Sequence, residues 1–217
     1  MLKSEVLIVM DKRDIIKISM ENIALIYNDV GEIAKSIEQR LSNGAGFSAY
    51  GDAAITWENS TAWYGNESWL YRWFARAYYM KETPRKAIGY CIHLGGYKTE
   101  EIERFQKFGI QLPALIMSSL DLKNDISNIS RINLYDLLWD AGWNEKQTVD
   151  GKIAKATLVR DNVSVMSESL AVDLLGLKGK EDIEDAVIKP LTSLYYKKET
   201  DTSSSKILPI GTKGSEQ

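Results

Sequence analysis

A regular stripe of apolar residues between Ser19 and Leu41 constrains the fold more than any other feature of the sequence. Apolar side chains recur there every three or four residues, at Ile23, Ile26, Tyr27, Val30, Ile33, Ala34, Ile37 and Leu41. This spacing puts them on one face of an α-helix, with most charged residues on the opposite face. Asn43 and Gly44 tolerate positive φ, so we expect the helix to end at residues 42–44.

Three segments after this helix have the character of β-strands. Phe47–Trp57 mixes small and apolar residues, with an irregularity at Gly51–Asp52. In Trp69–Met80 the aromatic residues are so dense that neither a helical spacing nor a strand alternation can be singled out. The aromatic enrichment favours a strand. Lys86–Leu94 alternates cleanly, and the small residues on one of its faces predict a closely packed neighbour.

A helix and a buried strand complete the first half of the chain. Thr99 can cap a helix that Gly109 ends, and Leu112–Leu122 is an apolar run typical of a buried strand. Residues 13–122 therefore have the order helix, strand, strand, strand, helix, strand. This order predicts an α/β or α+β fold, a mixed sheet with helices packed on it.

The second half predicts further helices and strands. We expect a short helix at Leu134–Trp139 with Asn133 as its cap, and strands at Ile153–Val159 and Val163–Leu177. A helix at Glu181–Tyr196 should bend or split at Pro190. The polar residues 197–217 predict a disordered tail, which leaves residues 1–196 as a single α/β domain.

Composition restricts the compartment and the partners. The net charge is −3 and the pI is about 5.4, which gives no overall attraction to nucleic acid or anionic lipid. One cysteine, Cys91, excludes a disulfide framework and favours the cytoplasm. No stretch reaches the ~18–20 apolar residues that a bilayer crossing needs, so we expect no membrane partner.

The only histidine, His93, is a weak catalytic candidate. Cys91 stands two residues before it on the same face of the predicted strand. Side chains two apart on a strand point in parallel and rarely make the hydrogen bond that a nucleophilic pair requires. We therefore favour burial of both residues under a packed helix.

A metal-dependent nuclease is the enzymatic alternative. The predicted element order is also the core order of the PD-(D/E)XK nucleases, which is an analogy of fold alone. Asp52 and Glu58, with Glu32 or Glu38 from the first helix, could then hold Mg²⁺. The strand Lys86–Leu94 lacks the internal acid and lysine of such enzymes, so the site would be degenerate or non-standard. Outside this alternative we expect no cofactor and no metal.

The segment from Trp69 to Phe108 carries eight basic and four acidic residues, a local charge of +4. A strand period puts Arg72 and Arg76 on one face, while the other face is all rings and suits a core. The alternatives are a core with arginines at its rim or an exposed binding surface. The candidate ligand-binding residues of that surface are Arg72, Arg76, Trp63, Trp69 and Tyr78.

These observations favour a non-catalytic cytoplasmic protein that binds through an aromatic and arginine-rich surface. Its ligand would be a protein partner or a phosphate-bearing molecule, a nucleic acid or a nucleotide. An oligomer that buries the ring-rich surface is also possible on this sequence.

Overall fold

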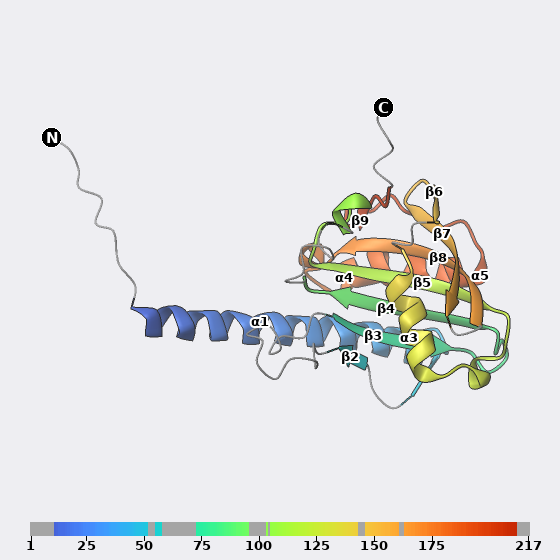
Figure 1. Ribbon diagram of the computed structural model, residues 1–217, viewed down its shortest axis with the longest axis horizontal. Helices are drawn as coiled ribbons and strands as arrows, with labels where there is room; N and C mark the ends of the chain where they lie inside the picture. Colours follow the sequence, from blue (N-terminus) through green and yellow to red (C-terminus); the bar gives the residue numbers. More distant parts are fainter. Residues whose placement is uncertain are drawn as a thin grey trace. The chain divides into compact units, whose positions relative to one another are not determined.

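The computed structural model describes residues 11–51, 55–57, 73–95, 103, 105–142, 146–160 and 163–211 (Figure 1). The chain separates into two compact units, Met1–Ser36 and Ile37–Gln217. Helix α1, Lys12–Gln39, confirms the predicted helix and starts seven residues before Ser19. No breaker interrupts those residues, and Asp14 suits the first turn of a helix. A short π-helical segment, Arg40–Gly44, ends it where predicted.

The second unit is built on one antiparallel sheet. Its strand order is β1-β3-β4-β5-β8-β7-β6, with β2 also paired to β3 and β9 to β8. The strands are β1 Ser48–Ala49, β2 Ile55–Trp57, β3 Trp73–Tyr79, β4 Lys86–His93, β5 Ala114–Leu122, β6 Thr148–Asp150, β7 Ile153–Arg160, β8 Val163–Asp173 and β9 Ile207–Leu208. The predicted combination of helices with a sheet is confirmed. The sheet itself is not mixed, because every described pairing is antiparallel.

The predicted strands near the aromatic segment are confirmed where the structure describes them. The strand expected at Phe47–Trp57 is divided into β1 and β2, and Gly51 between them has a φ of +81°. Both short strands pair with β3. Trp69–Met80 is a strand over Trp73–Tyr79, and residues 69–72 lie outside the described part.

Helix α3, Arg131–Asp140, packs on one face of the sheet, which we call the α3 face. Ala75, Ala77, Ala87 and Cys91 are buried there in one cluster with Leu138 and its neighbours on α3. A Cβ added at Gly89 would lie only 2.6 Å from Leu138 Cδ1, so glycine permits the close approach. The close packing predicted from these small residues is confirmed.

The opposite face of the sheet, the α5 face, carries the other side chains of the same strands. Ile88 and Ile92 of β4 and Met117 of β5 are fully buried on it. Helix α5, Lys189–Tyr196, contacts β4 and β5, and its Tyr195 ring packs edge-on against Phe47 at 4.9 Å. Alternate side chains of β4 are therefore buried on the α3 face and on the α5 face.

The predicted split of the last long helix is confirmed. It is divided into α4, Lys180–Ile183, a π-helical segment Glu184–Ile188, and α5 with Pro190 in its first turn. Proline has no backbone N–H and clashes with the preceding turn of a regular helix, which accounts for the break. The remaining short elements are 3₁₀ turns at Ile126–Asn128 and Leu174–Gly176.

Two boundary predictions are corrected. The cap of α3 is Ser130, whose Oγ accepts a hydrogen bond from the backbone N–H of Asn133 at 3.2 Å, so Asn133 is not the cap. Residues 197–211 are not a disordered tail, because Ile207 pairs with β8 and both Ile207 and Ile210 are buried. Among the described residues, no helix has the length and apolar character that a membrane crossing would require.

Candidate functional site

His93 and Cys91 lie on the α3 face and are buried, as the favoured interpretation predicted. The His93 ring packs between Phe105 and Trp139, with centroid distances of 4.7 and 4.6 Å. Burial lowers the pKa of His93 to about 3 and raises the pKa of the Cys91 thiol well above its usual value. Both groups are neutral near pH 7, so this pair offers neither a general base facing solvent nor a thiolate nucleophile.

Arg76 and Tyr78 share one face of β3, as predicted, but that face lies in the interior. Arg76 is 5% exposed and Tyr78 is fully buried, so the structure contradicts an exposed binding surface at these two residues. The Arg76 guanidinium pairs with Glu38 at 3.3 Å between Nη2 and Oε1. Glu38 therefore neutralises a buried arginine, a role different from the metal ligand of the nuclease alternative.

The other predicted site residues lie outside the described part of the chain: Asp52, Glu58, Trp63, Trp69 and Arg72. Their proposed roles stay predictions. Glu32, the second first-helix acid named in the nuclease alternative, forms an exposed ion pair with Lys35 at 2.8 Å. Within the described ranges, no three His, Cys, Asp or Glu side chains are grouped closely enough to hold a metal ion.

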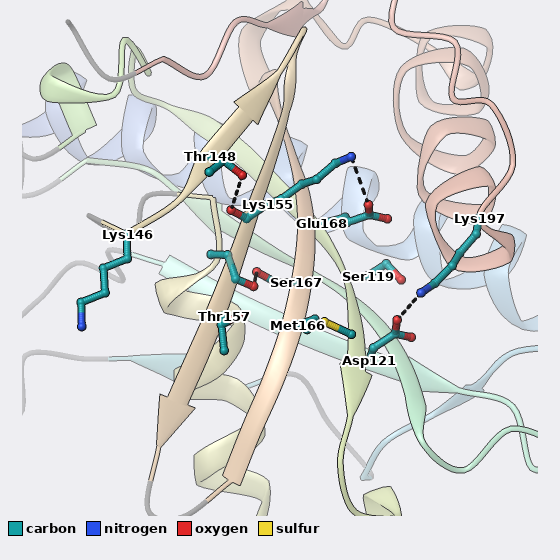
Figure 2. A pocket seen from close by; sticks show the side chains of 11 residues that line it. Ser119, Asp121, Lys146, Thr148, Lys155, Thr157, Met166, Ser167, Glu168 and Lys197 are labelled. Atoms are coloured by element: carbon teal, nitrogen blue, oxygen red, sulfur yellow. Dashed lines mark hydrogen bonds and ion pairs between the residues drawn. The ribbon is translucent and has the colours of Figure 1, made fainter.

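A hollow of about 320 Å³ opens on the α5 face of the sheet beside the end of α5 (Figure 2). We call it the sheet hollow. Strand pairing brings its floor together in two rows across three strands: Lys155, Glu168 and Ser119 form one, and Thr157, Met166 and Asp121 form the other. The remaining lining residues are Lys146, Thr148, Ala156, Ser167 and Lys197.

Ion pairs stand on two sides of the sheet hollow (Figure 2). Lys197 Nζ lies 2.6 Å from Asp121 Oδ2, and this contact raises the pKa of Lys197. Lys197 follows α5 directly with a left-handed φ of 50°, the usual conformation for ending a helix. On the other side, Lys155 Nζ lies 3.7 Å from Glu168 and 3.4 Å from Asp150.

The charges of the sheet hollow are balanced. Its lysines are Lys146, Lys155 and Lys197, and the carboxylates that line it or pair with them are Asp121, Asp150 and Glu168. Three positive charges thus face three negative ones. An anion gains little from a neutral region, whereas a ligand with charges of both signs can match it.

An exposed apolar surface completes the site. Met166 in the floor is 61% exposed, and Val159, diagonal to it across the β7–β8 pair, is 67% exposed. Methionine adapts to differently shaped partners and is enriched at protein interfaces. An exposed methionine between two ion pairs is therefore available on the sheet.

The sequence did not reveal the sheet hollow, because its members come from distant segments. Asp121 falls within the predicted strand Leu112–Leu122, and Lys197 was assigned to the tail. A usable signal was present in β7 and in the first half of β8, Val163–Glu168, where buried and accessible side chains alternate. That alternation indicates one face left open to solvent.

The fold and the hollow define an antiparallel α+β protein with a charge-balanced depression on its sheet. No family model, no curated protein and no solved structure matches the chain. The chemistry of the site itself is therefore the basis for a functional assignment.

Proposed function

We propose that this chain is a cytoplasmic binding protein without catalysis of its own, and that the sheet hollow receives a polypeptide segment of a partner protein. One observation carries the proposal: paired lysines and carboxylates surround the exposed Met166. This combination of an apolar centre with a charged rim is the usual anatomy of a protein interface. The buried free thiol of Cys91 supports a reducing compartment.

The charge balance favours a polypeptide over a phosphate-bearing ligand. Phosphate binding gains its energy from uncompensated Lys and Arg that release counterions. Lys155 and Lys197 already have carboxylate partners, so a phosphate would have to displace Glu168 or Asp121. A polypeptide can extend the existing pairs with charges of both signs while an apolar side chain covers Met166.

The rim and the centre should contribute differently. The paired lysines are about half exposed, and ion pairs of this kind add little affinity while they orient the ligand. Met166 can be desolvated completely by a partner side chain, which is the property of an interface anchor.

Selection of peptides from a displayed random library on the full chain tests the proposal. Met166→Glu should weaken the selected peptides at least ~10-fold, because binding would bury an unpaired carboxylate. Leu175→Glu is the matched control, since Leu175 is 71% exposed and lies outside the hollow. Equal losses from the two variants would contradict the site.

Salt dependence tests the class of ligand. Between about 50 and about 200 mM NaCl, binding of a selected peptide should change little, whereas a ligand held by several phosphate contacts would lose affinity by orders of magnitude. Tight binding of a nucleotide with such a loss, abolished by Arg72→Ala, would instead favour a phosphate ligand at the aromatic segment.

A further inference from the structure

The first half of helix α1 presents a large apolar surface that is not covered. Ile15, Ile16, Met20 and Ile26 are 49%, 64%, 56% and 50% exposed. Helices of this kind gain most of their stability from packing, and isolated ones are marginal in water. Ile18 and Leu25, on the other side of the helix, are 44% and 61% exposed as well. Exposed apolar side chains in this number indicate a surface that is buried in an assembly.

The spacing of these residues identifies the kind of surface that can cover them. From Ile16 onward, apolar residues follow in strictly alternating steps of four and three, at Ile16, Met20, Ile23, Tyr27, Val30, Ala34, Ile37 and Leu41. This is a period of 3.5 residues, which suits a second helix wound around the first. Its last two members, Ile37 and Leu41, are fully buried, while Ile16 and Met20 are more than half exposed.

We propose that α1 pairs with α1 of a second copy of this chain as an antiparallel two-helix coiled coil, through the stripe that begins at Ile16. The same stripe on both copies makes the surface self-complementary, as a two-fold pair requires. Of the other helices described, α3 and α5 pack in the second unit, Ile37–Gln217, which we call the globular unit. Helix α1 is thus the described helix with an exposed stripe.

The charges along α1 determine the orientation. Residues 12–17 contain Lys12, Arg13 and Lys17 against Asp14, and residues 18–34 contain only acids, Glu21, Asp29 and Glu32. A parallel pair would place the two basic ends side by side. An antiparallel pair brings each basic end beside the acidic part of the other copy, which is favourable.

The same charges disfavour a lipid surface as the partner. Residues 12–36 carry four basic side chains (Lys12, Arg13, Lys17, Lys35) and four acidic ones (Asp14, Glu21, Asp29, Glu32), a balance of zero. Helices that lie on anionic membranes have a polar face rich in Lys and Arg. A second copy satisfies both the period and the charge pattern.

The mass of the full chain in solution, measured by light scattering, tests the pairing. The wild type should have about 49 kDa, twice the 24.5 kDa of one chain. Ile16→Glu should return it to one chain, because the pair would have to desolvate a charge within the stripe. Asn28→Glu, at an exposed polar position outside the stripe, is the matched control and should stay paired. Ile16 is 64% exposed, so its substitution leaves the globular unit folded, which circular dichroism verifies.

A monomeric wild type would overturn the proposal, as would a dimer that Ile16→Glu leaves intact.

Cysteine pairs test the orientation of the two helices, because the native Cys91 is buried and does not react. In an antiparallel pair that places Met20 opposite Ile23, residue 16 of one chain faces residue 27 of the other. The two residues 16 then lie roughly 16 Å apart along the helix axis. Ile16→Cys with Tyr27→Cys should form a disulfide-linked dimer on oxidation, and Ile16→Cys alone should not. Efficient linkage of the single variant would show a parallel pair and refute the orientation. Binding of the monomer to vesicles of anionic lipid would refute the second copy as partner.

Discussion

At the scale of single residues, burial decides the chemistry of the two most reactive side chains. His93 and Cys91 are the residue types most often found in catalysis, yet both lie under α3. The pKa of each is displaced in the direction that keeps it neutral, by loss of hydration. Their contribution is to packing, and through His93 they make the stability of the fold dependent on pH.

The pH dependence of stability should show the titration of His93. Its pKa is about 3 in the folded chain and ~6.5 when unfolded, so between these values only the unfolded chain binds the proton. The contribution of His93 is therefore complete above about pH 6.5 and is lost as the pH falls, by about 1.4 kcal/mol per pH unit. Urea unfolding from pH 7 to pH 4 measures it against His93→Phe, which keeps a ring between Phe105 and Trp139. Identical slopes for the two proteins would show that His93 is not the titrating group.

At the scale of elements, local hydrogen bonding determines where helices begin. Ser130 has extended backbone angles and its side chain accepts from Asn133 N–H, which satisfies a donor that the first turn leaves free. Sequence reasoning chose Asn133 because Asn is also a good cap and stands next to the first leucine. The helix starts three residues earlier than its apolar positions indicate.

Two alanine substitutions separate these assignments. Ser130→Ala should destabilise the globular unit by about 1 kcal/mol, because the backbone N–H of Asn133 in the first turn of α3 loses its acceptor. Asn133→Ala should change the free energy of unfolding by less than about 0.5 kcal/mol, since its backbone N–H is retained. Urea denaturation of both variants gives the comparison. A larger loss from Asn133→Ala would restore it as the cap.

The sequence predicted elements better than it predicted the surroundings of their side chains. The alternation of β4 and its small-residue face were correct, because a period of two and the size of Gly89 are local properties. The exposure assigned to Arg76 and Tyr78 was wrong, because the period separates two faces without showing whether both are covered. The sheet hollow depends on the register of β5, β7 and β8, and the pairing of β5 with β8 joins residues more than 40 positions apart.

At the scale of the whole molecule, the end of the chain returns to the sheet. Strand β9 pairs with Ala171 and Val172 of β8, beyond the last residue of β8 that pairs with β7. Strand β9 therefore lies on the same edge of β8 as β7 and pairs with β8 where β7 no longer does. Ile207 and Ile210 are buried in a stretch that composition alone describes as disordered, and Leu208 between them packs against the core.

Removal of the Ile207 side chain should thus destabilise the globular unit and not merely loosen its end. Ile207 is 1% exposed, so Ile207→Ala leaves a cavity beside β8 and should cost about 2–5 kcal/mol of unfolding free energy. Leu175→Ala is the control, because Leu175 is 71% exposed and its truncation should cost less than about 0.5 kcal/mol. Urea unfolding followed by tryptophan fluorescence reports on the globular unit, since Trp139 packs against its core. Equal midpoints for the two variants would mean that residues 197–211 form a tail after all, and that the sheet is complete without β9.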